Sequence, residues 1–163
     1  MPSEFPAYAT KFVEKSQVEE FAVSQVAGEV LLVGDLCVWD APNGWVERAG
    51  ADPAAGTIVG ISEVDSEKAR VLTPNGKIPI RRINVDTVFA LSSATDYVEA
   101  THRNQEYGIT RSANGRWRVD TAKTGASARV VVRDGVVANF GPGQGNIWLV
   151  QFLAEFIADA IDS

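Results

Sequence analysis

The residues best suited to covalent chemistry are the single cysteine, Cys37, and the single histidine, His102. A thiol beside an imidazole can serve as a nucleophile activated by a general base. However, Cys37 lies inside the apolar run 36–39, where a free cysteine ordinarily acts as a small buried hydrophobic residue. Nothing in the sequence brings the two side chains together, so we predict no catalytic pair. Two such residues also cannot form a four-ligand zinc site.

A glycine-rich segment, residues 141–145, lies between an apolar run and the C-terminal tail. Glycine-rich turns of this kind bind phosphate at the N-terminus of a following helix. A dinucleotide site also requires a following parallel strand and an acidic partner for the ribose, and the sequence offers neither. We therefore interpret the segment as a loop and expect no cofactor.

Carboxylates and tryptophans are the remaining groups that could bind a substrate. Asp35 with Asp40 and Asp65 with Glu67 are close in sequence, but neither pair has the context of a glycosidase or cation site. The tryptophans lie in apolar segments, where packing is their usual role; they are Trp39, Trp45, Trp117 and Trp148. We predict neither an enzyme nor a metal site.

Composition limits the class of partner. The chain has 163 residues, of which 15 are basic and 21 acidic, giving a formal net charge of −6. This balance argues against a general nucleic-acid-binding protein, which needs positive charge to displace counterions from phosphates. No apolar run approaches the roughly 20 residues of a membrane span. We expect partners that are neither nucleic acid nor membrane.

Short β-branched runs separated by Asn-Gly or Asp-Gly fill the middle of the chain. The dipeptides begin at Asn43, Asn75, Asn114 and Asp134, and they favour type I′ hairpin turns because both central residues must adopt positive φ. The pattern predicts a mainly β fold with two small barrel- or sandwich-like units, residues 21–83 and 84–146.

The two ends of the chain differ from this body. Residues 1–20 predict an extended arm, with four apolar side chains that must dock on this chain or on a neighbour: Phe5, Tyr8, Phe12 and Val13. Residues 147–163 show helical spacing of apolar residues, from Leu149 to Ile161, and predict one amphipathic α-helix. Such a helix is unstable alone in water, so its apolar face must be covered.

A familiar order of features runs through the first unit. It comprises Gly28-Glu29, Gly34-Asp35, Asn43-Gly44-Trp45-Val46, the small-residue stretch 50–55 and Gly60-Ile61-Ser62, followed in the second unit by Tyr107-Gly108-Ile109, Trp117-Arg118-Val119-Asp120 and residues 128–132. This order resembles the head decoration (cement) proteins of tailed bacteriophages.

The resemblance implies a non-enzymatic virion protein that is made in the host cytoplasm and binds the outside of the capsid. Its partners would be the major capsid protein and further copies of itself, commonly as a trimer that stabilises the head. We expect the apolar ends to contact the capsid or sister subunits, through Phe5, Tyr8, Phe12, Val13, Trp148, Phe152, Phe156, Ile157 and Ile161. The alternatives are another virion structural protein, such as a tail tube or connector, or a carbohydrate-binding module that uses the tryptophans.

Overall fold

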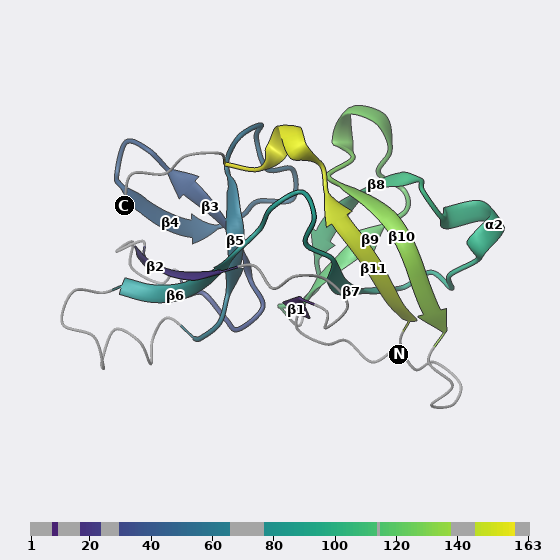
Figure 1. The fold of residues 1–163 in the computed structure, drawn as a ribbon, viewed down its shortest axis with the longest axis horizontal. Coiled ribbons are helices and arrows are strands. Elements are labelled where there is room, and N and C mark those ends of the chain that lie inside the picture. The colour runs from purple at the N-terminus through teal and green to yellow at the C-terminus, as the bar shows by residue number, and fades with distance from the viewer. Residues whose placement is uncertain are drawn as a thin grey trace.

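A computed structural model describes residues 8–9, 17–23, 30–65, 77–113, 115–137 and 146–158. Within them the chain is mainly β, as predicted, and its strands form two sheets. The helical segments are short: α2 (Glu99–His102), η1 (Gly125–Ser127) and η2 (Ala154–Phe156). Figure 1 shows the two sheets side by side; the first is formed by β2–β6 and the second by β7–β11 together with the N-terminal strand β1.

The first barrel is formed by five strands: β2 (Val18–Ala22), β3 (Leu36–Asp40), β4 (Trp45–Arg48), β5 (Ile58–Ser62) and β6 (Lys77–Arg82). Their order in the sheet is β2-β6-β5-β3-β4. A parallel bridge between Val23 and Val46 brings the first strand back to the last. The β3–β4 hairpin reverses where Asn43-Gly44 predicted a turn, but the connection spans residues 41–44 and Gly44 alone of the dipeptide has positive φ, at 69°, so it is not the predicted two-residue type I′ turn.

The second barrel contains β7 (Phe89–Ser93), β8 (Glu106–Arg111), β9 (Trp117–Asp120), β10 (Val130–Val137) and β11 (Asn146–Phe152). Their order is β7-β11-β10-β8-β9, and a parallel pairing of β7 with β9 closes the sheet. The short strand β1 (Tyr8–Ala9) is added to the edge of β7, opposite Ala90 and Phe89.

The two barrels have the same topology. Numbered within each barrel, the strand order is first, fifth, fourth, second, third in both, and the closing contact between first and third strands is parallel in both. The interior positions also correspond, because Phe21 lies opposite Ile78 in the first barrel as Leu91 lies opposite Trp148 in the second. The chain is therefore one barrel pattern built twice, which we did not predict from the sequence.

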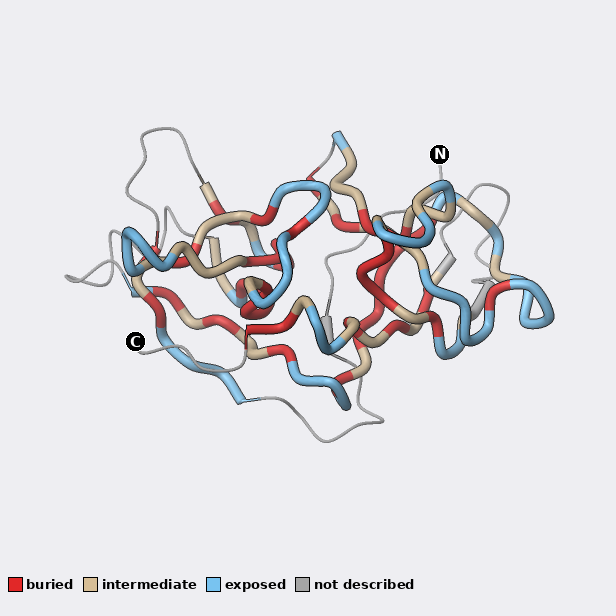
Figure 2. Tube along the Cα trace, turned by 90° about the horizontal axis from the view of Figure 1, so that it is seen from above, coloured by how far each residue is buried: buried red, intermediate tan, exposed pale blue. Residues whose placement is uncertain are grey.

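Buried side chains join the barrels rather than separating them. One hydrophobic cluster fills the first barrel and includes Phe21, Cys37 and Ile80. The other begins in the first barrel, with residues such as Leu36 and Ile58, and continues into the core of the second. Buried segments accordingly run through both halves of the molecule in Figure 2. Small barrels have limited cores of their own, and this shared packing supplements both.

The predicted C-terminal helix is wrong for the part of the tail that the structure describes. Residues 146–152 form β11, which pairs with β10 on one side and β7 on the other. Trp148, Val150 and Phe152 alternate inward with the period of a strand. After η2 the chain reaches the first barrel, where Ile157 forms a bridge to Ile58. The pattern was compatible with both structures, and the two flanking strands favour the extended one.

The predicted turn at Asp134-Gly135 is also wrong. These residues continue β10, whose pairing with β11 is shifted by a bulge between Val132 and Asp134. A Cβ atom on Gly135 would come 2.8 Å from the Cβ of Tyr97. Glycine is therefore required here because a tyrosine side chain crosses the strand closely, and not because the chain reverses.

Two glycines provide a direct test of close backbone packing. A Cβ on Gly60 would meet the Arg81 backbone, including its carbonyl carbon at 2.8 Å, whereas a Cβ on Gly50 would meet nothing within 4 Å. We expect Gly60→Ala to lower the free energy of unfolding by about 1–3 kcal/mol. The matched variant Gly50→Ala should change it by less than about 1 kcal/mol. Urea denaturation of both variants measures the difference, and equal stabilities would contradict the packing at Gly60.

Candidate functional site

The structure does not bring Cys37 and His102 together. Cys37 is fully buried in the core of the first barrel. His102 belongs to the second barrel, where its ring centroid lies 4.7 Å from that of Trp148. Its Nδ1 accepts a hydrogen bond from the Val98 amide at 2.9 Å, so this nitrogen is already occupied. Each side chain therefore serves in packing, Cys37 in the core of the first barrel and His102 among the aromatic rings of the second.

We expect the Cys37 thiol to be unreactive in the native protein. Burial, aided by the nearby Asp35 charge, raises the pKa of this thiol far above its usual range. Only the thiolate is nucleophilic, so iodoacetamide should modify the native protein at pH 8 far more slowly than the urea-unfolded protein. Mass spectrometry over time measures both rates, and rapid native labelling would contradict the burial.

The Cys37 thiol also makes the free energy of unfolding depend on pH in the alkaline range. In the unfolded chain the thiol ionises at about pH 8.5, whereas in the folded chain it keeps its proton. The folded state therefore binds more protons above that pH, and Cys37 contributes a loss of stability as the pH rises further. The variant Cys37→Ala, which removes the ionisable group, should lose less stability between pH 8 and pH 10.

Asp35 is the centre of a buried polar cluster that links the barrels. Its fully buried carboxylate accepts hydrogen bonds from Arg111 Nε and Trp117 Nε1, both at 3.0 Å, and from the Leu32 amide at 2.8 Å. Asp35 precedes β3 in the first barrel, whereas Arg111 and Trp117 belong to β8 and β9 of the second. Its carboxylate is thus committed to a structural ion pair.

Of the other carboxylates considered from the sequence, the two that the structure describes make hydrogen bonds within the chain. Asp40 accepts hydrogen bonds from the amide and side chain of Asn43, which stabilise the β3–β4 turn. Asp65 accepts one from the Val33 amide at 2.9 Å. Glu67 lies outside the described residues, as does the glycine-rich segment 141–145. Where the structure describes the chain, it contains no cluster of three His, Cys, Asp or Glu side chains arranged to hold a metal.

The side chains predicted to contact a capsid or sister subunit at the C-terminal end are used within this chain. Trp148, Phe152 and Ile157 are buried in the cluster that joins the barrels. Phe156 is half-buried, with the Arg129 guanidinium 4.1 Å above its ring. Strand alternation turns Trp148 and Phe152 into the chain's own core, and Ile157, which follows η2, is buried there as well, so these three side chains are not exposed for the predicted contact. For the half-buried Phe156 an intermolecular contact stays a prediction.

The N-terminal contact residues are largely outside the described residues. Phe5, Phe12 and Val13 lie there, as does Ile161 at the other end. Tyr8 is described by its backbone, which pairs with Ala90 in β7. The arm therefore docks on its own chain at this point, which was one of the two alternatives expected.

An open groove of about 580 Å³ lies on the first barrel and is lined in part by the β3–β4 hairpin. Its lining combines one aromatic ring, two prolines, three carboxylates and small residues, namely Val38, Trp39, Asp40, Ala41, Pro42, Glu47, Gly50, Asp52, Pro53, Ala54 and Thr57. Trp39 is the sole tryptophan in this lining; Trp117 and Trp148 are buried in the other cluster, and Trp45 is not part of the lining. The four tryptophans therefore form no common platform.

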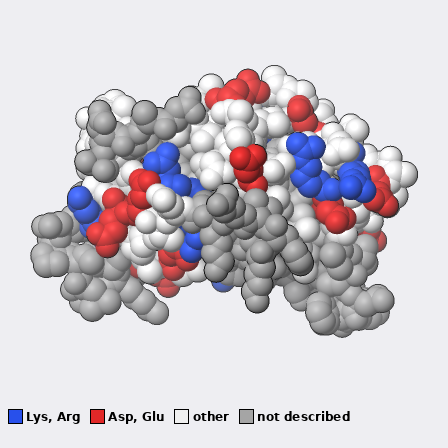
Figure 3. All heavy atoms as spheres, viewed as in Figure 1, with Lys and Arg blue, Asp and Glu red and all other residues white. Residues whose placement is uncertain are grey.

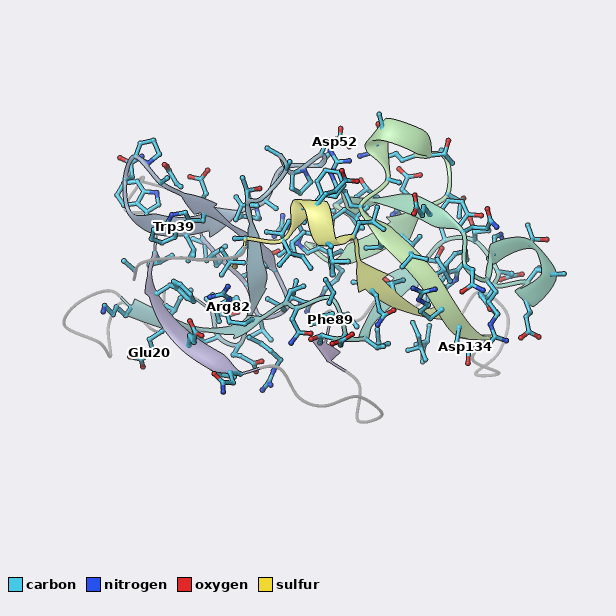
Figure 4. The ribbon with its side chains drawn as sticks, turned by 45° about the horizontal axis from the view of Figure 1, so that its top comes forward. Glu20, Trp39, Asp52, Arg82, Phe89 and Asp134 are labelled. Carbon is cyan, nitrogen blue, oxygen red and sulfur yellow. The ribbon has the colours of Figure 1, made fainter. Side chains whose placement is uncertain are left out.

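The second barrel holds the loop that forms one wall of this groove. Arg129 Nε donates to the Pro53 carbonyl at 2.8 Å, and Lys123 Nζ lies 3.2 Å from both the Ala51 carbonyl and an Asp52 carboxylate oxygen. Figure 4 shows Asp52 beside the second barrel and Trp39 on the hairpin. The groove is therefore formed before any partner binds.

The chain was then compared with known proteins. No protein-family model, curated protein or solved structure matches it. None of the helices that the structure describes has the length and hydropathy of a membrane-spanning helix.

Charge on the visible face is mixed rather than divided into large patches. In Figure 3 the basic side chains lie next to acidic ones. Arg81 pairs with Glu63, and Arg103 pairs with Glu99. The lining of the groove contains three carboxylates and no lysine or arginine, although Lys123 pairs with one of them, Asp52, from the second barrel. Its chemistry suits a partner that presents basic groups or hydrogen-bond donors beside apolar side chains.

Proposed function

We propose that this chain is a non-enzymatic structural protein of a tailed bacteriophage virion, a decoration (cement) protein that binds the outer surface of the capsid and stabilises the head. The observation that carries the proposal is the position of the groove. Two of the features behind the resemblance, the Asn-Gly hairpin and the small-residue stretch 50–55, flank it. A preformed, acidic and partly apolar groove provides a contact surface for a rigid partner such as a capsid lattice.

The tandem of barrels supports a mechanical role. The barrels share a core, the Asp35 cluster, and a bridge from Ile157 to Ile58. A cement protein must transmit load between the capsid subunits that it joins, which requires few internal hinges. We propose the major capsid protein as the partner and a homo-trimer as the assembly, since closed cyclic symmetry lets one interface be used repeatedly.

The first experiment is proteomics of purified virions of the virus that encodes this chain. We expect the protein at a copy number comparable to that of the major capsid protein, with density on the outside of the head by electron cryomicroscopy. Density in the tail would instead identify the tail or connector alternative. Light scattering of the purified protein tests the trimer separately.

A matched pair of variants tests the groove. Ala54→Arg places a bulky cation in the groove, whereas Ala122→Arg makes the same change at an exposed position outside its lining. Capsids stripped of the protein should rebind the Ala122→Arg variant but lose most of their occupancy with Ala54→Arg in co-sedimentation. Equal occupancy would show that the groove is not the capsid-binding surface.

A further inference from the structure

The repeated barrel contains a counterpart of the site where β1 binds, at an edge that no described strand covers. In the second barrel, β1 pairs with β7 at Phe89 and Ala90. The equivalent positions in the first barrel follow from strand register: Phe89 lies opposite the buried Val150, and Glu19 lies opposite the buried Ile80. The strand edge at Glu19 and Glu20 therefore corresponds to the edge that β1 covers.

No strand in the described ranges covers this edge. β2 pairs with β6 along its whole length, and on its other side it touches β4 through the single bridge from Val23 to Val46. Residues 18–20 are exposed, and Val18 alone keeps 44% of its surface accessible. By contrast, Phe89 and Ala90 are fully buried.

The backbone of this edge is oriented to accept a further strand. The Arg82 amide donates to the Gln17 carbonyl at 2.9 Å, so Gln17 directs its hydrogen-bonding groups toward β6. Because these groups alternate along a strand, the backbone groups of Val18 and Glu20 point away from β6. An extended segment laid along β2 would meet these outward-pointing groups, as in β-strand addition.

The side chains of the edge select for positive charge. Glu19 lies 3.3 Å from Arg82, a partly exposed pair, whereas Glu20 makes no ion pair with any other described residue. Figure 4 shows Glu20 on the outer side of β2, and Phe89 near the junction of the two barrels. Opposite charges on facing strands stabilise pairing, and like charges oppose it.

We propose that the outer edge of β2, at Val18–Glu20, is a strand-addition site for an extended, lysine- or arginine-bearing segment of a partner protein. Tyr8–Ala9 of the same chain occupy the equivalent edge, and no other described segment lies along the outer edge of β2, so we assign that edge to a segment of another protein. Main-chain hydrogen bonds provide the pairing, and the two glutamates favour a basic segment over an acidic one. This inference does not depend on the partner being a capsid protein.

The test uses blocked peptides with the alternating sequence Lys-Val-Thr-Val-Lys-Val and its Glu-Val-Thr-Val-Glu-Val counterpart, each added to the full chain. We expect the basic peptide to slow amide hydrogen exchange at Val18 and Glu20 and to bind more tightly than the acidic one. The proposal would be overturned if the two peptides bound equally well. It would also be overturned if the basic peptide slowed hydrogen exchange at other residues but not at Val18 and Glu20.

Variants separate charge from backbone pairing. Glu20→Lys should weaken binding of the basic peptide about fivefold. Glu106→Lys makes the same charge change at an exposed strand residue of the second barrel and should leave binding unchanged. Val18→Pro removes an outward-pointing amide and should abolish the protection from hydrogen exchange at this edge. If Val18→Pro fails to fold, the comparison of Glu20→Lys with Glu106→Lys still tests the proposal. Stronger binding by a peptide of residues 5–12 would instead identify a second copy as the occupant and overturn the assignment to another protein.

Discussion

Replacing Asp35 by alanine is expected to lower the free energy of unfolding by about 3–5 kcal/mol, because it leaves a partly buried cation and a buried indole N–H without their acceptor. The carboxylate is fully buried and binds Arg111 and Trp117 from the other barrel. Chemical denaturation of the purified variant measures the loss. Asp35→Asn, which keeps one acceptor oxygen but removes the charge, should lose less stability than Asp35→Ala.

An exposed ion pair provides the control. Glu99 in α2 pairs with Arg103, the residue after this helix, and more than half of each side chain is accessible. Glu99→Ala should change stability by no more than about 0.5 kcal/mol, since solvent screens such pairs. If Asp35→Ala costs no more than this control, the Asp35 cluster does not hold the barrels together.

Replacing Trp148 by alanine should be comparably damaging, by about 3–5 kcal/mol. Its indole is fully buried, lies within 6.1 Å of the rings of Tyr97, His102 and Tyr107, and donates to the Thr95 carbonyl at 3.1 Å. The loss should appear in the isolated protein, because every one of these contacts lies within one chain. Trp148→Phe, which keeps most of the volume, should retain more of the stability.

This second prediction distinguishes the two roles considered for Trp148. If Trp148 contacted a capsid or a sister subunit, its replacement would weaken assembly and leave the stability of the isolated chain unchanged. Val98→Ala, at an exposed position in the second barrel, provides the control and should change stability by less than about 0.5 kcal/mol. Unfolding of the Trp148→Ala variant at the same urea concentration as the unmodified chain would contradict the core role.

Part of the candidate site was visible in the sequence. The hairpin at Asn43-Gly44 and the stretch 50–55 were singled out, and both flank the groove. That they face one another could not be inferred, because Lys123 and Arg129 of the second barrel hold the loop in place. The repeat was missed, although Asn43-Gly44-Trp45 and Asn114-Gly115-Arg116-Trp117 each lead into the third strand of a barrel and could have indicated it.

The sequence by itself determined the strand-rich body, because β-branched runs and the Asn43-Gly44 turn act through neighbouring residues. It left the tail undecided, since the residues from Trp148 to Ile157 satisfy both a helical and an alternating pattern. Only the tertiary structure decided between them: β7 and β10 flank the segment and satisfy its backbone groups as a strand. The Asp35–Arg111 pair is likewise a tertiary outcome, because its partners are distant in sequence and meet only when the barrels pack.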